Sequence, residues 1–487
     1  MKNSYKNKLH SALARNRQAL GTRTAKVGGY SFVLCLVVLA ILIAVNVLVG
    51  MLPSRFTQLD ISAAQLYSLT ADTKVVATNL EQDVTIYWIV QAGEEDTVIE
   101  KLLDRYGDLS EHITVVKKDP DVYPTFAQQY TDQTVTNNSL VVESGEKSRY
   151  IAYEDIYEYD TSNYYTTGSV SQSFDGEGQT TSAIDYVVRE DLPQVYLLSG
   201  HGEQELSETF TDELARSNYE TVSDFSLLNV DAVPEDCDAL IINAPTSDIS
   251  EEELELLRDY VTGGGKLLVF SGPQEEETLP NLHALLSDYG VAAAEGIVVD
   301  TDRDHYAFTA PYVLMPDIES SEITDPLADG GYHVIIPIAQ GLDTSGADSS
   351  VTALLTTSDT AFSKISGYDM STYEKEEGDL DGPYTLAVSI EDSTAGGRIV
   401  WVATDYLLDG LYNSYSSGAN LDLAMNSLSW MIGESDAVSI RAKSLDYNYL
   451  TISSSAATWL KIVMIGVIPV GFLLLGIDEI LRRRKKL

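Results

Sequence analysis

Two long hydrophobic segments, one near each end of the chain, constrain the fold more than any other feature of this sequence. Residues 31–52 carry no charged side chain, and residues 456–477 carry only Lys461. A helix of about 20 apolar residues is long enough to span the hydrocarbon core of a bilayer. We therefore predict two transmembrane helices, over 30–52 and 456–480, with a large body between them.

Basic residues flank both hydrophobic segments. Seven Lys and Arg and no acid occupy the tail 1–29, and five Lys and Arg lie in the tail 481–487. Because basic flanks stay on the cytoplasmic side, we expect a two-pass protein of the cell membrane, with both termini in the cytoplasm and residues 53–457 outside. A cleaved signal peptide is the alternative for the first segment. Its apolar run is longer than the roughly 7–15 residues usual in such peptides, which favours an uncleaved anchor.

The body between the two segments is strongly acidic. It holds 72 of the 74 Asp and Glu but only 18 of the 31 Lys and Arg, in a chain whose net charge is −43. Such a surface repels nucleic acid and anionic lipid headgroups, so neither is an expected ligand. Cys35 lies in the first hydrophobic segment and Cys237 in the body, so they cannot form a disulfide framework.

Helix and strand patterns alternate over residues 53–190 and predict a small, membrane-proximal α/β domain. Apolar, β-branched runs predict strands at 84–90 and 113–116, and the spacing of apolar residues predicts a helix over 98–106. The polar stretch 161–181 is rich in Gly, Ser and Thr, and we interpret it as a loop or linker.

The alternation becomes regular over residues 193–435 and predicts a second, larger domain. Ser250 and Glu253 have the spacing of a capping box at the start of one of its helices. Repeated βαβ units predict a doubly wound parallel sheet covered on both faces, followed by a juxtamembrane linker over 436–455. The predicted strands are 195–198, 238–243, 266–270, 296–300, 384–390 and 398–404, and the closing helix is 420–432.

The strongest candidate site is the run Gly200-His201-Gly202-Glu203. It follows a predicted strand and precedes a helix, at the edge where doubly wound proteins bind ligands. His201 with Glu203 has the chemistry to bind a metal or transfer a proton, but no nucleophile or metalloenzyme motif accompanies it. Asp405 follows another predicted strand at this edge. We therefore assign these five residues to contact with a ligand or partner, and expect no catalytic residue, no metal site and no cofactor.

Two other motifs resemble ligand-binding loops but lack the residues or the order that such loops need. Gly263-Gly264-Gly265-Lys266 follows a predicted helix and precedes a strand, the reverse of a phosphate-binding loop, so we interpret it as a helix-ending turn. Asp300, Asp302 and Asp304 have the spacing that opens a calcium loop. His305 stands where that loop needs glycine, which excludes an EF-hand and leaves loose cation binding as the alternative to a solvated loop.

The order of several short motifs resembles that of GldG-type proteins, auxiliary components of ABC transport systems first associated with gliding motility. The motifs are Leu59-Asp60-Ile61-Ser62, the strand and G-H-G-E loop over 195–203, the S-E-E-E-L helix and G-G-K-L-L-V strand within 239–270, and the closing strand and helix over 398–405 and 420–430.

The resemblance implies a larger domain with a fold like that of class I glutamine amidotransferases, without their catalytic Cys-His pair. It also implies an ABC permease and a cytoplasmic ABC ATPase as partners. We therefore expect a non-enzymatic auxiliary subunit that captures an unknown extracellular ligand or couples a partner to the transporter. The alternative is a membrane-tethered hydrolase or carbohydrate-processing enzyme, because two carboxylates need only be close in space to act on a glycosidic bond.

Overall fold

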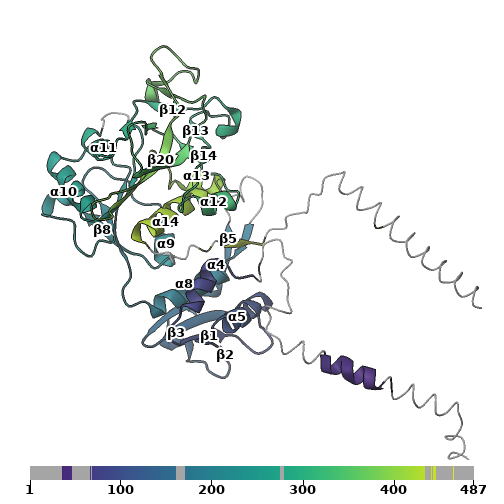
Figure 1. Cartoon of the computed structure of the whole chain (residues 1–487). Helices are drawn as coiled ribbons and strands as arrows, with labels where there is room; N and C mark the ends of the chain where they lie inside the picture. Colours follow the sequence, from purple (N-terminus) through teal and green to yellow (C-terminus); the bar gives the residue numbers. More distant parts are fainter. Residues whose placement is uncertain are drawn as a thin grey trace, which may run out of the picture.

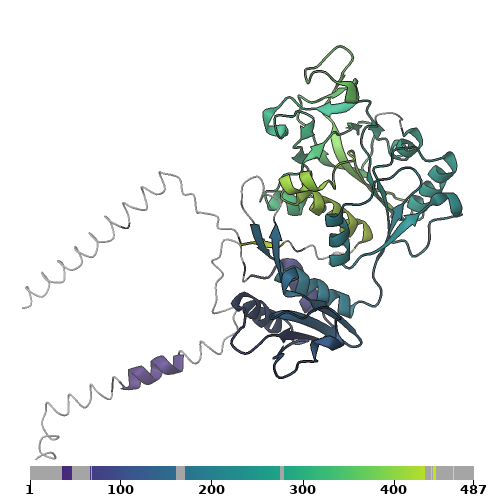
Figure 2. The ribbon, with the colours of Figure 1, turned by 180° about the vertical axis from the view of Figure 1, so that it is seen from behind.

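The computed structural model describes residues 34, 36–45, 66, 68–160, 171–274, 279–433, 440, 442–445 and 464. They form two α/β domains and a helix over 36–45, which lies away from both domains in two opposite views (Figures 1 and 2). This helix belongs to the first predicted span, and its apolar side chains are exposed. Within the described part of the chain, no helix is both long and apolar enough to cross a bilayer. Most of both predicted spans, and both predicted tails, fall outside the described residues.

The first domain is a four-stranded sheet with helices packed on one face. β1 and β2 are parallel, and β3 and β4 continue the sheet in antiparallel pairs. Side chains along the strands alternate between the helix-covered core and the opposite face, as the period of two in a strand requires. The sheet order is β2-β1-β3-β4 (Ile113–Lys118, Val84–Ile89, Ser139–Ser144, Lys147–Ile151), and the helices are α4 (Ala71–Thr78), α5 (Thr97–Leu109) and α8 (Gly176–Val188). The strands and the helix predicted in this region are confirmed.

Strand β6 (Ser171–Phe174) and helix α8 correct the interpretation of 161–181 as a loop or linker over residues 171–181, whereas 161–170 lie outside the described residues. Most residues of the helix are buried, because it packs across β3 and β4. The first residue of the helix, Gly176, has no room for a side chain, because a Cβ there would lie 2.4 Å from the Phe174 ring. The Gly, Ser and Thr that resemble a solvated loop in the sequence are therefore the packing surface of a buried helix.

A small sheet brings the far end of the body back to the first domain. β22 (Lys443–Ser444) pairs with β6 (Ser171–Phe174), which pairs with β5 (Tyr157–Asp160) after the short helix α6 (Tyr153–Ile156). The Lys443 ammonium donates to the Ser68 carbonyl at 2.6 Å and to Glu177 at 2.7 Å. The two ends of the described body therefore meet at one place.

The second domain contains the predicted parallel sheet. Five strands run parallel in the order β8-β7-β9-β10-β21, and β9 is buried along its whole length. Helices α9 and α14 pack on one face of the sheet, and α10 and α11 pack on the other. The strands are Glu220–Phe225, Gln194–Leu198, Ala239–Asn243, Lys266–Phe270 and Arg398–Val402, and the helices are α9 (Glu208–Arg216), α14 (Ala419–Ile432), α10 (Glu251–Thr262) and α11 (Pro280–Ser287).

The remaining strands of this domain are antiparallel, which corrects the prediction of an all-parallel sheet. β20 (Thr385–Glu391) is joined to β21 by six residues, and so short a connection permits only an antiparallel pair. The strand predicted at 296–300 forms as β12 (Ile297–Val299) but pairs outside the main sheet, with β18. The other elements are β11 (Ala292–Ala293), β13 (Val313–Leu314), β14 (Asp317–Ile318), α12 (Asp325–Asp329), β15 (Ile336–Pro337), β16 (Leu342–Asp343), β17 (Val351–Thr356), β18 (Phe362–Lys364), β19 (Leu380–Asp381) and α13 (Gly410–Tyr415).

Candidate functional site

The topology of the parallel sheet singles out one crevice at its carboxyl edge. After β8 the chain crosses back over β7 to form β9 on the other side, so the loops after β7 and β9 leave the sheet in opposite directions. Doubly wound proteins bind ligands at such a switch point. The run Gly200-His201-Gly202-Glu203 follows β7 directly and therefore lies there.

The backbone of this loop is joined to the loop after β9. The carbonyl of His201 accepts hydrogen bonds from the amides of Thr246 at 3.0 Å and Ser247 at 2.9 Å. Gly200 and Gly202 have φ angles of 123° and 72°, which disfavour other residues. A Cβ on Gly202 would also lie 2.1 Å from the Thr246 hydroxyl, so this position requires glycine for two independent reasons.

The side chain of His201 is buried between two carboxylates. Its Nδ1 lies 3.1 Å from Glu203 Oε1, and its Nε2 lies 3.1 Å from Glu253 Oε2. The hydrogen bond to Glu203 raises the pKa of His201 above its ordinary value, although burial opposes this. Burial acts to raise the pKa of both carboxyls, but hydrogen bonds from His201 and from nearby backbone amides hold each below its usual value. The three groups form a charged unit, Glu–His⁺–Glu, which we call the His201 clamp.

Glu253 connects the clamp to helix α10. The predicted capping box is confirmed: Ser250 Oγ accepts from the Glu253 amide at 3.2 Å, and Glu253 Oε2 accepts from the Ser250 amide at 2.9 Å. The same Oε2 atom binds His201. The clamp therefore ties the loop after β7 to the start of the helix that follows β9.

A pocket of about 500 Å³ opens beside the clamp, between the ends of β7 and β8. Three acidic residues, Glu203, Glu205 and Asp224, line it together with polar side chains and backbone. Glu203 is already paired with His201, and its side chain is only 6% exposed. The pocket thus presents hydrogen-bonding groups and negative charge. The other side chains at its wall are those of Leu197, Leu198, Ser199, Gln204, Leu206, Thr211, Thr221, Ser223, Ile241 and Asn243.

Asp405 lies at the same edge of the sheet but not at this pocket. It follows β21, which is separated from β7 by β9 and β10. Its carboxylate accepts from the Gly272 amide at 2.7 Å and from the Gln274 side chain at 3.2 Å. Burial raises the pKa of Asp405 to about 6. The structure therefore brings Gly200, His201, Gly202 and Glu203 together and leaves Asp405 apart, joining the loops after β10 and β21.

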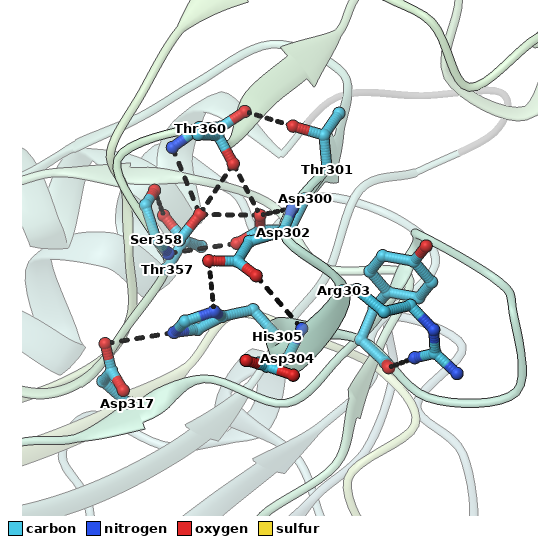
Figure 3. A network of polar contacts seen from close by, with 11 residues as sticks. Asp300, Thr301, Asp302, Arg303, Asp304, His305, Asp317, Thr357, Ser358 and Thr360 are labelled. Carbon is cyan, nitrogen blue, oxygen red and sulfur yellow. Dashed lines mark hydrogen bonds and ion pairs between the residues drawn. The ribbon is translucent and has the colours of Figure 1, made fainter.

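The acidic motif after β12 is held by hydrogen bonds within the protein (Figure 3). The Asp300 carboxylate accepts from the Ser358 amide at 3.0 Å and from the Ser358 hydroxyl at 2.7 Å. His305 lies between Asp302 and Asp317, at 3.4 and 3.3 Å. In the part of the chain that the structure describes, no group of three His, Cys, Asp or Glu side chains is arranged to hold a metal ion.

The Gly263–Lys266 motif ends a helix, as its order in the sequence indicates. Gly264 has a φ of 104° just after α10, and the Lys266 ammonium donates to the Gly396 carbonyl at 2.6 Å. The sequence also pointed to Glu253, but only as a capping residue. Its contact with His201, 52 positions away, required the two loops to be placed side by side.

The larger domain is a doubly wound α/β domain. The buried Glu–His⁺–Glu unit holds the loop at its switch point in place. Residues 192–427 match a family model described as an ABC-type uncharacterized transport system, which supports the assignment of this domain to the auxiliary family of ABC transport. Residues 63–157 match a model described as a domain of unknown function, DUF7088. No curated protein matches the chain. The narrower resemblance to GldG-type proteins stays a prediction.

Solved structures resemble the chain only distantly. The "mmIFT52 N-terminal domain" is 16% identical, with a TM-score of 0.37, and the match covers 49% of this chain and 97% of that one. The exo-beta-1,4-mannosidase Op5Man5 from Opitutaceae bacterium strain TAV5 is 11% identical, with a TM-score of 0.26, covering 68% and 48%. PurLQS from Thermotoga maritima is 10% identical, with a TM-score of 0.24, covering 49% and 98%.

Proposed function

We propose that this chain is a non-enzymatic auxiliary subunit of an ABC-type transport system, which captures a ligand or couples an extracytoplasmic partner to the transporter. The observation that carries the proposal is the state of His201. Both of its ring nitrogens are hydrogen-bonded to buried carboxylates. The group at the switch point that is best suited to acid–base catalysis therefore has no free nitrogen for a substrate and instead stabilises the fold. The family match over 192–427 supports the link to transport, and the predicted glutamine amidotransferase-like fold belongs to the same proposal.

The proposed subunit is anchored at both ends in one membrane, with its body outside and its termini in the cytoplasm. Two features support this arrangement: the basic flanks of the hydrophobic segments, and the hydrogen bond between Lys443 and Ser68. That contact lets both connections to the membrane leave the body from one place. Protease added outside intact cells is expected to release one large acidic fragment. A full-length chain that resists protease on accessible cells would contradict the topology.

The proposed partners are an ABC permease and a cytoplasmic ABC ATPase. The described residues contain no phosphate-binding loop, since the only Gly-Lys cluster ends a helix. The proposal therefore assigns ATP hydrolysis to another chain. Purification in mild detergent through a tag on the cytoplasmic tail is expected to recover both partners. Recovery of the chain alone, under conditions that keep other ABC complexes intact, would count against the assignment.

A hydrolase or carbohydrate-processing enzyme is the second candidate, and the acidic pocket beside the clamp is the observation that favours it. Glu205 and Asp224 are the pocket acids outside the clamp. The test is an assay of the purified protein against a panel of glycosides and esters, with Glu205→Gln and Asp224→Asn as variants. The subunit proposal expects no turnover. Turnover that either variant abolishes would establish the enzyme instead.

A further inference from the structure

The first domain contains a pocket that neither the His201 clamp nor the family match explains. It has a volume of about 520 Å³ and lies where β1 and β2 end, with Gln91 following β1 and Lys118 closing β2. These two strands are parallel neighbours, so their loops leave the sheet at the same edge. This is the position at which parallel sheets build ligand sites.

Lys118 brings a positive charge to this pocket. Among the described residues it forms no ion pair, whereas its neighbour Lys117 pairs with Glu100 at 3.0 Å and Glu95 at 3.6 Å. The Lys118 ammonium instead lies over three aromatic rings, 4.8 Å from the centre of Phe126, 5.1 Å from Tyr123 and 5.4 Å from Tyr87. The rings attract the cation without neutralising it, so its charge remains available to a ligand.

The aromatic wall around Lys118 is held in place before any ligand arrives. The Tyr87 and Phe126 rings meet edge to face at 4.9 Å, and Phe126 lies 5.3 Å from Tyr130. The Tyr130 hydroxyl donates to Glu143, which fixes this ring in turn. Tyr123 remains 53% exposed and offers an open aromatic face at the mouth of the pocket.

Polar side chains complete the lining and limit the charge of a ligand. Gln128 and Gln133 line the pocket, and neither side-chain amide has a hydrogen-bond partner among the residues that the structure describes. Asp119 and Asp121 follow Lys118 closely in the chain. With one lysine, no arginine in the lining and two acids nearby, the site favours a singly charged anion over a phosphate.

We propose that this pocket binds a small monocarboxylate that carries a flat or apolar body. The carboxylate accepts hydrogen bonds from the Lys118 ammonium, and the body lies against Tyr123 and Phe126. The side-chain amides of Gln128 and Gln133 are placed to bind further polar groups of the ligand. In a chain with a net charge of −43, such a site selects anions that the rest of the surface repels.

The test measures binding of benzoate to the full-length protein in detergent by titration calorimetry, with benzamide and inorganic phosphate as comparison ligands. Benzoate is expected to bind, and benzamide at least about tenfold more weakly, because it lacks the charge that pairs with lysine. Phosphate is expected to bind more weakly than benzoate. Failure of benzoate to bind, or equal affinity for benzamide, would overturn the proposal.

Lys118→Gln and Lys117→Gln form a matched pair of variants. Both remove one positive charge from β2, but successive residues of a strand point to opposite faces, and Lys117 does not line the pocket. Lys118→Gln is expected to weaken benzoate about tenfold or more, while Lys117→Gln leaves the affinity unchanged. Equal effects of the two variants would show that benzoate responds only to the overall charge of the protein, and would contradict the proposed binding site.

Tyr123→Ser provides a second test that leaves the cation in place. It removes an exposed ring and is expected to weaken benzoate while preserving its preference over benzamide. The thermal midpoints of all variants show whether each is folded. Unchanged benzoate affinity in Tyr123→Ser would contradict the proposed position of the ligand body.

Discussion

His201 lies in a polar sequence motif that predicts contact with a ligand, yet its side chain is buried in the structure. Its side chain is 7% exposed, and those of its two partners are 6% and 3% exposed. Removing the cation would leave two carboxylates facing each other away from water. The structure therefore indicates that His201 stabilises the fold, in addition to the ligand or partner contact expected from the sequence.

His201→Ala is predicted to lower the free energy of unfolding by about 3–5 kcal/mol, the usual cost of breaking a buried ion pair from one side. His112→Ala is the control, because His112 also pairs with a carboxylate, Asp83, but on the surface. Its expected effect is below about 1 kcal/mol. Urea denaturation measures both, and equal losses would show that the His201 clamp contributes no more than an exposed pair.

Gly202→Ala is predicted to destabilise the protein more than Gly331→Ala. Both glycines have similar φ angles, 72° and 68°, so both substitutions incur about 1–2 kcal/mol of backbone strain. Only Gly202 faces a neighbour, the Thr246 hydroxyl, while a Cβ on Gly331 meets nothing within 4 Å. Adding Thr246→Ala should recover part of the Gly202→Ala loss and none of the Gly331→Ala loss. Equal unfolding free energies for the two single variants would refute the predicted clash.

At the scale of elements, helix α9 joins the candidate site to the first domain. Its capping residue Ser207 comes four positions after Glu203, and its last residue, Arg216, binds Asp175 at 2.8 Å. Just beyond it, the Asn218 side chain donates to the Ser182 carbonyl at 3.0 Å and accepts from Arg149 at 2.7 Å. Helix α9 and the residues just after it therefore connect the loop after β7 to helix α8.

Arg216→Leu is predicted to destabilise the protein strongly, because the buried carboxyls of Asp175 and Glu213 would lose their shared cation and would have to stay charged in the interior or take up a proton. Asp175→Asn in the same chain should recover the part of the loss that comes from Asp175, since a neutral amide needs no cation. Arg258→Leu is the control, because Arg258 pairs with Asp288 and Glu255 on the surface. The denaturant midpoints of the unmodified protein, the two single arginine variants and the double variant are compared. A double variant no more stable than Arg216→Leu would contradict a buried charge as the cause.

At the scale of the whole molecule, four described groups that titrate near neutral pH have raised pKa values: Asp175, Asp405, His201 and His305, the last because its hydrogen bond to Asp317 outweighs burial. Burial raises the pKa of Asp175 to about 7 and that of Asp405 to about 6, and the bond to Glu203 raises that of His201. Each group binds protons more tightly in the folded state than in the unfolded state. Their contributions are therefore lost as pH rises through their folded pKa values.

The thermal midpoint is accordingly predicted to fall as pH rises from about 5 to 8, with His283, whose pKa burial lowers, opposing the fall below about pH 6.5. The carboxyls of Glu203 and Glu253 have lowered pKa values, so they add the opposite loss only below about pH 4.5. Calorimetry at constant ionic strength checks the profile. Asp405→Asn should flatten the part of the profile below about pH 6, and a midpoint that rises between pH 5 and 8 would show that other groups dominate.

Local sequence patterns sufficed for most of the central strands and for the capping box at Ser250. Runs such as 239–243 and 266–270 are continuous and apolar because both faces of the sheet are covered. A capping box acts within four residues, so its partners are adjacent in the sequence. The mixed α/β fold and its parallel region follow from these patterns, which is why they could be predicted.

Only the tertiary structure decided the contacts between distant residues. The polar composition of 161–181 predicts a loop, yet α8, which begins within this stretch at Gly176, is buried because small side chains let it lie against β3 and β4. The antiparallel pairing of β20 with β21 depends on which edge of the sheet is free. The contact of Lys443 with Ser68 depends on where the two ends of the body lie. The contact between His201 and Glu253 has the same origin. The period of apolar residues predicts which face of a segment is buried, but a contact between residues 52 positions apart depends on how whole helices and strands pack together.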